Sequence, residues 1–472
     1  MYAQCVSGAV SFPRTPALPN PFLHPFVAKS FAKCHRVDPA ALRQFQNQQL
    51  RRLVKHAWNH VPFYRGLYND AGVDIAAFRG LADLEKLPVV TRRQLQETAP
   101  EQLIARGLSL DALVTRKTSG SSGAPIAIRR TRLEEVFLQA SRFPARSALG
   151  VRPWERRARV ALIHRVHTGG VKQISSESQR AWLFPFRSFD GLGEPSALAQ
   201  GLADYQPRNV TGNPGFLERM CMEADPALLK RIRPRVVMCG GETLQLGVRR
   251  LIESTLEAPV YDFYGAHEFN FIAWQREHNG PFETSGLVTL AEVLRPTTAE
   301  DSLSRSNVGE PGEFVGTALW SFASPFIRYR LGDDVTAHEL DDHYGTCRSL
   351  RSIHGRVTDR FVTIEGLTMH AYEAVTALLT HMPWTLCYQM EQYRAGELLI
   401  RVLPAGESNS LQREESHLRL RETLAPQFAV TVEFVEHLRR GAEAKRKLFI
   451  RHVPLPQSPA SPIRETLSGH HS

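Results

Sequence analysis

The residue types best suited to binding phosphate form one short run near position 120. It consists of Thr118, Ser119, Gly120, Ser121, Ser122 and Gly123. Glycines let a backbone turn its N–H groups toward an anion, and hydroxyl groups donate further hydrogen bonds to it. The run lacks the spacing of a Walker loop, and Ala124 stands where the G-x-S-x-G elbow of a hydrolase needs glycine. Composition alone therefore leaves phosphate binding and an ordinary mobile loop equally open.

Charged side chains that could serve the same chemistry follow in four later segments. Glu268 and Asp333 each come after an apolar segment, Arg356 follows a glycine, and Lys445 has basic neighbours at positions 446 and 447. Taken singly, each is typical of a surface carboxylate, a structural ion pair or a solvated basic run. Their order and combination along the chain favour a shared site.

Two further groups of residues are weaker candidates. His164 and His167 lie three apart after an apolar segment, but no carboxylate or third histidine stands at a ligand spacing, so a structural role is favoured over a metal site. Aromatic side chains that could line a site for an aromatic acid are more often part of a core. They are Phe137, Phe143, Phe184 and Phe186.

The elements that would position these residues can be read from hydrophobic spacing. Apolar residues recur with helical spacing over 50–58, and Pro62 marks the end of that helix. A strand, the Gly/Ser/Thr run, a second strand and a helix follow in order. Thr131 with Glu134 three residues later forms a capping box, which predicts a helix through Gln139. Segment 159–163 reads as a strand, and segment 209–214 reads as a strand end that breaks into a turn.

The clearest unit spans 235–264, where a strand, Gly240-Gly241-Glu242, an amphipathic helix and a strand follow one another. This order is typical of a parallel sheet, whose ligands gather at the carboxyl ends of the strands. Strands over 314–319 and 326–331 indicate a β-rich subdomain. Helices over 372–379 and 418–424 alternate with strands over 386–390, 398–402 and 430–435, which predicts a small α+β module.

Size and composition exclude several classes of protein. A chain of 472 residues exceeds the usual size of one core, so at least two domains are expected. No apolar run is long enough to span a membrane. The net charge of +10 is spread along the chain without a zinc-finger or RNA-recognition signature, which disfavours nucleic acid. Six scattered cysteines without a C-x-x-C pair indicate thiols in a reducing compartment, and a cytoplasmic location is expected.

Taken in order, these motifs resemble those of the adenylate-forming superfamily, and most of all its phenylacetate–CoA ligase branch. Segments 48–53, 61–64 and 87–91 are similar to the opening segment of that branch, and the likeness runs over roughly 40–450. The motifs that carry it are residues 118–123, Gly240-Gly241-Glu242, Tyr264-Gly265-x-x-Glu268, Tyr329-Arg330-x-Gly332-Asp333, Gly355-Arg356 and Lys445.

The resemblance implies a two-step reaction that uses ATP, Mg²⁺ and coenzyme A. A carboxylate attacks the α-phosphorus of ATP to give an acyl-adenylate, and a thiol then displaces AMP. Residues 118–123 would hold the β- and γ-phosphates, Glu268 would ligate Mg²⁺, and Asp333 would bind the ribose hydroxyls. Lys445 would bridge the carboxylate and α-phosphate in the first step only, since in this superfamily a small domain swings between the steps about a hinge, here near Asp359.

The remaining matched positions would contact the nucleotide or the acyl group. Gly240, Gly241 and Glu242 would line the adenosine and acyl sites, Tyr264 and Gly265 would lie near adenine, and Arg356 would contact ribose or phosphate. The chain departs from the family at Ala124, where many relatives carry lysine, and at Ala444, where glycine is common. His267 replaces the usual serine or threonine, and Lys447 lies close enough to leave the choice of Lys445 open.

The expected fold is α/β, with a large adenylation domain over 1–358, in which 1–38 is irregular, a small cap over 359–453 and a disordered tail over 454–472. The expected enzyme is an acid–thiol ligase acting on an aryl or arylacetic acid. Transfer to an amine or a carrier protein, or a degenerate member that binds nucleotide without turnover, remain alternatives. Expected partners are the acid, ATP and coenzyme A, without nucleic acid, and a homodimer is one option for assembly.

Overall fold

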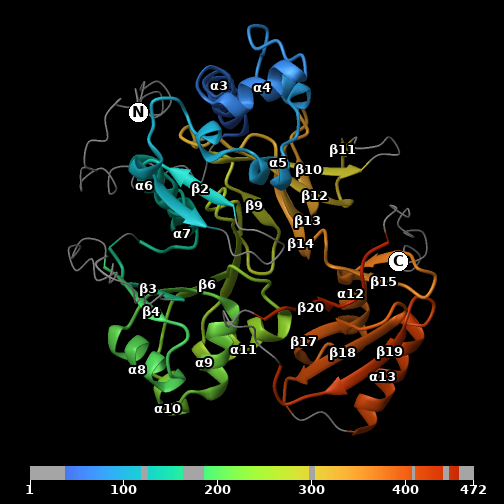
Figure 1. Cartoon of the computed structure of the whole chain (residues 1–472). Coiled ribbons are helices and arrows are strands. Elements are labelled where there is room, and N and C mark those ends of the chain that lie inside the picture. Colours follow the sequence, from blue (N-terminus) through green and yellow to red (C-terminus); the bar gives the residue numbers. More distant parts are fainter. Residues whose placement is uncertain are drawn as a thin grey trace. The chain divides into compact units, whose positions relative to one another are not determined.

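The computed structural model of the protein describes residues 38–117, 126–152, 154–162, 185–296, 303–406, 410–438 and 446–456. Contacts within the chain divide it into two units, each made of two stretches of sequence (Figure 1). The first unit comprises Met1–Glu155 and Tyr261–Ile353, and the second comprises Arg156–Val260 and His354–Ser472. Each unit therefore depends on segments that are far apart along the chain.

The described part of the first unit begins with the helix that the apolar spacing predicts. Helix α3 spans Pro39–His60, and the side chain of Asp38 caps its first turn by accepting the N–H of Ala41 at 3.0 Å. Pro62 follows its end as predicted and also begins α4 (Pro62–Asp70), where a proline fits because the first helical N–H has no partner in the helix. Short helices continue the segment: η2 (Leu81–Lys86), α5 (Arg92–Glu97), η3 (Pro100–Leu103) and η4 (Leu110–Ala112).

A hairpin and a helix follow in the predicted order, and a second helix, which the sequence analysis did not predict, comes after them. Strands β1 (Val114–Lys117) and β2 (Ala127–Arg130) pair antiparallel. The predicted phosphate-binding run, 118–123, and Ala124 lie between them and outside the described residues. Thr131 and Glu134 form the predicted capping box of α6 (Arg132–Ala140), and α7 spans Phe143–Ala148.

The rest of the first unit is a largely antiparallel sheet, in which the strand order is β11-β10-β12-β13-β14-β9-β8-β7. Residues 314–319 and 326–331 of the predicted β-rich subdomain overlap β12 and β13, although β13 runs far longer than expected. The strands are β7 (Val260–Tyr264), β8 (Ala273–Gln275), β9 (Phe282–Thr284), β10 (Thr289–Pro296), β11 (Leu303–Arg305), β12 (Pro311–Ala318), β13 (Tyr329–Leu340) and β14 (Cys347–Arg356).

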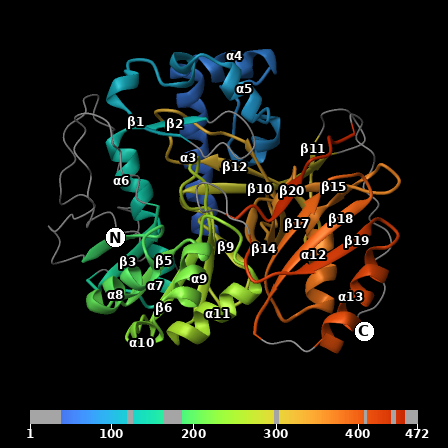
Figure 2. The ribbon, with the colours of Figure 1, turned by 60° about the horizontal axis from the view of Figure 1, so that its bottom comes forward.

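The first part of the second unit is a parallel sheet, as predicted. Its order is β6-β5-β3-β4, and the pairs β3–β4, β3–β5 and β5–β6 are parallel. Helices lie beside these strands (Figure 2). The elements are β3 (Arg157–Ala161), β4 (Phe186–Asp190), α8 (Pro195–Tyr205), β5 (Asn209–Gly212), α9 (Pro214–Glu223), α10 (Pro226–Leu229), β6 (Val236–Gly240) and α11 (Leu246–Leu256).

The second part of this unit contains the predicted α+β module. Its sheet has the order β19-β18-β17-β20, and a two-stranded ladder of β15 and β16 precedes it. Strand β20 was not predicted, because three residues after a basic run give little periodic signal. The elements are β15 (Arg360–Val362), β16 (Thr368–His370), α12 (Ala371–His381), β17 (Thr385–Gln392), β18 (Glu397–Pro404), α13 (Ser410–Leu424), β19 (Ala429–Phe434) and β20 (Phe449–Arg451).

The α/β class expected from the sequence is confirmed. In the described part of the chain, no helix has both the length and the apolar character needed to cross a membrane. The cysteines of the described residues are free, buried thiols: Cys221, Cys239, Cys347 and Cys387. Burial raises the pKa of Cys221 and Cys347 to about 12, which keeps these two thiols protonated and unreactive at neutral pH.

Candidate active site

In the first unit, the structure brings together Tyr264 and Asp333, two of the residues predicted to bind nucleotide. Tyr264 ends β7 and Asp333 lies in β13, and the tyrosine hydroxyl donates a hydrogen bond to Asp333 Oδ2 at 2.5 Å. Both residues are 8% exposed. The tyrosine ring packs edge-on against Phe314, with 5.6 Å between ring centroids. Tyr264 therefore orients the carboxylate for which the family resemblance implies ribose binding.

A tight turn after β7 carries Glu268. The backbone N–H groups of Phe269 and Asn270 both donate to the carbonyl of Ala266, at 3.1 and 2.6 Å. A Cβ atom at Gly265 would lie only 2.5 Å from the carbonyl oxygen of Asn270, so this position requires glycine. Glu268 is 3% exposed, whereas the neighbouring His267 is exposed. The turn thus holds the Glu268 carboxylate on a backbone that is closely packed.

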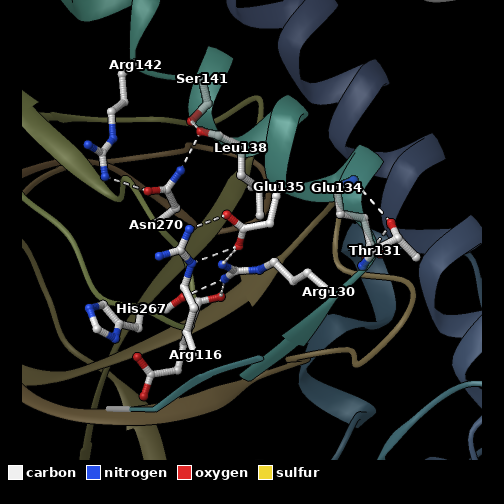
Figure 3. A network of polar contacts seen from close by, with 11 residues as sticks. Arg116, Arg130, Thr131, Glu134, Glu135, Leu138, Ser141, Arg142, His267 and Asn270 are labelled. Carbon is white, nitrogen blue, oxygen red and sulfur yellow. Dashed lines mark hydrogen bonds and ion pairs between the residues drawn. The ribbon is translucent and has the colours of Figure 1, made fainter. Parts of the chain in front are cut away.

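Arginines that sequence reasoning missed surround this turn (Figure 3). Arg130, at the end of β2, donates from Nη2 to the carbonyl oxygens of His267 and Glu268, at 2.5 and 2.8 Å. Its Nη1 donates to Glu135 of α6 at 3.1 Å, and Arg116 of β1 binds the same carboxylate through Nε and Nη2 at 3.2 and 2.8 Å. Burial alone would raise the pKa of Glu135, but Arg116 and Arg130 bring it below its ordinary value.

In the second unit, the predicted Gly240-Gly241-Glu242 segment follows β6. Gly241 has φ of +91°, a conformation that favours glycine. Glu242 Oε1 accepts the backbone N–H of Gly215, in the first turn of α9, at 2.7 Å. A carboxylate is favoured there because the N-terminus of a helix carries partial positive charge.

The same unit holds Arg446, which lies between the two candidate lysines. Its guanidinium donates to Glu218 of α9 at 2.9 Å and to the sulfur of Cys387 at 2.8 Å. The Arg446 side chain is 7% exposed and the Glu218 side chain 1%. Burial alone would lower the pKa of Arg446, but Cys387, Glu218 and Glu242 raise it above its ordinary value. Lys445 lies outside the described residues, and Lys447 is exposed.

Arg446 is part of a wider contact between the C-terminal module and the parallel sheet's helices. Gln245, before α11, accepts the backbone N–H of Tyr388 at 3.1 Å. A Cβ atom at Gly247 of α11 would overlap the carbonyl oxygen of Thr385 and the Cα atom of Leu386 in β17. At position 247 the backbones of α11 and β17 are therefore so close that no side chain larger than the hydrogen of glycine fits between them.

Arg356, the remaining predicted residue of this unit, is the last residue of β14, whose residues from His354 onward belong to this unit, and the turn near the expected hinge follows it. Gly355 before it has φ of +108°. The Arg356 backbone N–H donates to Asp359 Oδ2 at 2.8 Å, and His370 Nε2 lies 2.9 Å from the Arg356 carbonyl. Burial raises the pKa of Asp359, and Arg356 opposes that rise. Among the described residues, no cluster of three or more His, Cys, Asp or Glu side chains is arranged to hold a metal ion.

Comparisons with known proteins extend these observations. No protein-family model matches the sequence. The chain is 27% identical over 374 residues to the phenylacetate-coenzyme A ligase of Escherichia coli (strain K12), covering 76% of this chain and 80% of that protein. It is 27% identical over 375 residues to the phenylacetate-coenzyme A ligase of Thermus thermophilus, covering 76% and 79%.

A solved structure shares the fold. The crystal structure of 2-hydroxyisobutyryl-CoA ligase, in the postadenylation state in complex with R3-HIB-AMP, has a TM-score of 0.69 and 21% identity and covers 89% of this chain and 91% of that chain. At that identity the match speaks for the fold alone. It confirms the predicted α/β fold class.

Proposed function

We propose that this chain, a relative of the phenylacetate–CoA ligases with the fold of the adenylate-forming enzymes, joins a carboxylic acid to coenzyme A through an acyl-adenylate. The likeness to two phenylacetate-coenzyme A ligases over most of their length supports this reaction. One structural observation carries it. A turn held by Gly265 buries Glu268 at the end of β7, the strand whose last residue, Tyr264, binds Asp333.

In the first step, a carboxylate oxygen of the acid attacks the α-phosphorus of ATP, and the bond to pyrophosphate breaks. Negative charge on the phosphates must be neutralised by groups already in place. We assign the binding of the β- and γ-phosphates to residues 118–123. Lys445 would supply the ammonium group that bridges the carboxylate and the α-phosphate. Both lie outside the described residues. Asp333, oriented by Tyr264, would accept hydrogen bonds from the ribose hydroxyls.

The residues present fit a magnesium ion bound together with nucleotide. Mg²⁺ takes oxygen ligands, and in nucleotide sites one or two carboxylates usually suffice because phosphates and water supply the others. Glu268 offers such a carboxylate from a closely packed turn. When bound, the ion would neutralise charge on the phosphate oxygens.

In the second step, the thiolate of coenzyme A attacks the acyl carbon and AMP leaves. We propose that the cap, 359–453, turns about a hinge near Asp359 between the steps and removes Lys445 from the site. Gly240, Gly241, Glu242 and Arg356 would contact the adenosine or acyl group.

The proposed acid is an aryl or arylacetic acid, and the name of the two relatives above supports this class. Of the aromatic candidates, Phe143 is 4% exposed in a small core cluster and Phe137 packs on Trp320 with 4.2 Å between ring centroids, so both have packing roles. Phe184 lies outside the described residues, as do His164 and His167. A cytoplasmic location and a homodimer stay predictions.

The test offers phenylacetate, benzoates and indoleacetate to the purified full chain with ATP and Mg²⁺ and measures pyrophosphate release. Coenzyme A, hydroxylamine and amino acids are then added separately, and mass spectrometry identifies the product. Release of pyrophosphate followed by a coenzyme A thioester is expected. An amide product would favour the amine acceptor, and silence across a broad panel of acids would favour a degenerate member.

Lys445→Ala should lower adenylation by roughly a hundredfold or more, the scale of losing one preorganised charge contact. Thioester formation from supplied acyl-AMP should survive better, because Lys445 acts in the first step. Lys447→Ala, made alongside, decides between the two lysines. Loss of both half-reactions to the same degree in either variant would contradict the assignment.

A further inference from the structure

Arg130 contacts the two peptide units that flank Glu268. The carbonyl oxygen of His267 belongs to the peptide unit before Glu268, and that of Glu268 belongs to the unit after it. Arg130 Nη2 donates to both oxygens. Because peptide units are planar, holding both of them fixes φ and ψ of Glu268 and hence the direction of its Cα–Cβ bond. A guanidinium can do this because its donors form a rigid planar fork.

The charge of Arg130 is itself held in place. Its side chain is 4% exposed and that of Glu135 is 12% exposed, so the pair is largely desolvated. Arg116, on the opposite strand of the hairpin, binds the second side of the same carboxylate. Register pairs Arg116 with Ile128, two residues before Arg130. Glu135 therefore joins both strands of the hairpin and orients the guanidinium that reaches the Glu268 turn.

Asn270, at the end of the turn, also forms hydrogen bonds to the segment that follows β2. Asn270 has φ of +68°, and its side-chain oxygen accepts a hydrogen bond from Arg142 Nη2 at 2.6 Å. Its amide nitrogen donates to the carbonyl of Leu138 in α6. Figure 3 shows these contacts together with those of Arg130. The turn is thus bound at two points to the stretch that runs from β2 into α6 and α7.

We propose that Arg130 is a positioning residue, which holds the peptide units on both sides of Glu268 and so sets the direction in which its side chain leaves the backbone toward the metal, with Glu135 as the counter-ion of Arg130. This inference rests on the proposed function, in which Glu268 ligates Mg²⁺. Groups that orient a metal ligand act on metal affinity and on the step that uses the metal. The adenylation step needs the metal, whereas thioester formation from preformed acyl-AMP involves no triphosphate.

The experiment compares Arg130→Met, Arg130→Lys and Glu135→Gln with the wild-type full chain. Adenylation is followed by pyrophosphate release over a series of Mg²⁺ concentrations, and thioester formation is followed separately from supplied acyl-AMP. In Arg130→Met the Mg²⁺ concentration for half-maximal adenylation should rise roughly tenfold or more. Thioester formation should change less than about twofold. Arg132→Met, an exposed arginine of α6, is the matched control and should behave as wild type.

Arg130→Lys keeps a cation facing Glu135 but loses the planar fork, so it should show the same shift to a smaller degree and serves if the methionine variant does not fold. A purely structural role predicts that both half-reactions fall together while the Mg²⁺ dependence stays unchanged, and this result would overturn the inference. If the wild type is active and both Arg130 variants keep its Mg²⁺ dependence, the inference about Arg130 is overturned and the proposed function still stands. A wild type that adenylates no acid would overturn the proposed function, and the inference with it.

Discussion

Among single residues, Glu268 is the one on which the proposed first step most depends. Glu268→Gln keeps the size of the side chain and removes its charge. Adenylation should fall by roughly a hundredfold or more, because a preorganised charge contact to the metal is lost. The measurement is pyrophosphate release at saturating Mg²⁺. Glu97→Gln, whose side chain is 69% exposed, is the control. Full activity in Glu268→Gln would remove this residue from the metal site.

The start of the helix beside this site was predicted from the sequence, whereas the arginine that binds the turn was missed, and the reason can be identified. Thr131 and Glu134 were recognised because a capping box spans four consecutive residues. Arg130 and the carbonyl of His267 are 137 residues apart, and a carbonyl oxygen carries no mark in the sequence. A contact between a side chain and a distant backbone group is therefore invisible until the fold brings the two together.

At the scale of elements, the contact between α9 and the C-terminal segment depends on Arg446. Arg446→Met removes the guanidinium that faces the buried Glu218 carboxylate, and such a change typically destabilises by about 3–5 kcal/mol. Chemical denaturation of the full chain measures it. Lys447→Met, at an exposed position, should stay within about 0.5 kcal/mol of wild type.

A double variant, Arg446→Met with Glu218→Gln, sharpens this prediction. It removes both charges and should recover part of the lost stability, because no uncompensated charge is left buried. Equal destabilisation in the single and double variants would mean that packing, and not charge, holds α9 to this segment.

Elements were predicted where local signals were strong. Strand β6 and helix α11 followed from an apolar run and an amphipathic pattern close together in the chain. The strands of the first unit were harder to foresee. Strands β8, β9 and β11 have three residues each, and three residues are too few for an alternating pattern to be distinguished from a loop.

For the whole molecule, acid stability should depend on Glu391 of the C-terminal module. Burial alone would raise its pKa, but hydrogen bonds from Arg401 and His452 lower it from the ordinary 4.5 to about 2. The ionised form therefore stabilises the fold above about pH 4.5, and that contribution is lost as the pH falls toward about 2.

The free energy of unfolding of wild type and Glu391→Gln, measured from pH 7 to pH 3, checks this. The advantage of wild type should be constant down to about pH 5 and shrink below it. Glu415→Gln, at a pair whose side chains are both more than half exposed, is the control. An advantage that stays the same down to pH 3 would show that Glu391 acts through packing.

The glycine at position 247 has a consequence for how conformations of this chain can be studied. In Gly247→Ala, α11 and β17 can each still form, but they cannot pack as closely as they do here, because the added methyl group would overlap the carbonyl of Thr385. One added carbon would thus separate α11 from β17. Small-angle scattering from the Gly247→Ala variant, without any bound substrate, would measure the conformation that the protein adopts when this contact cannot form.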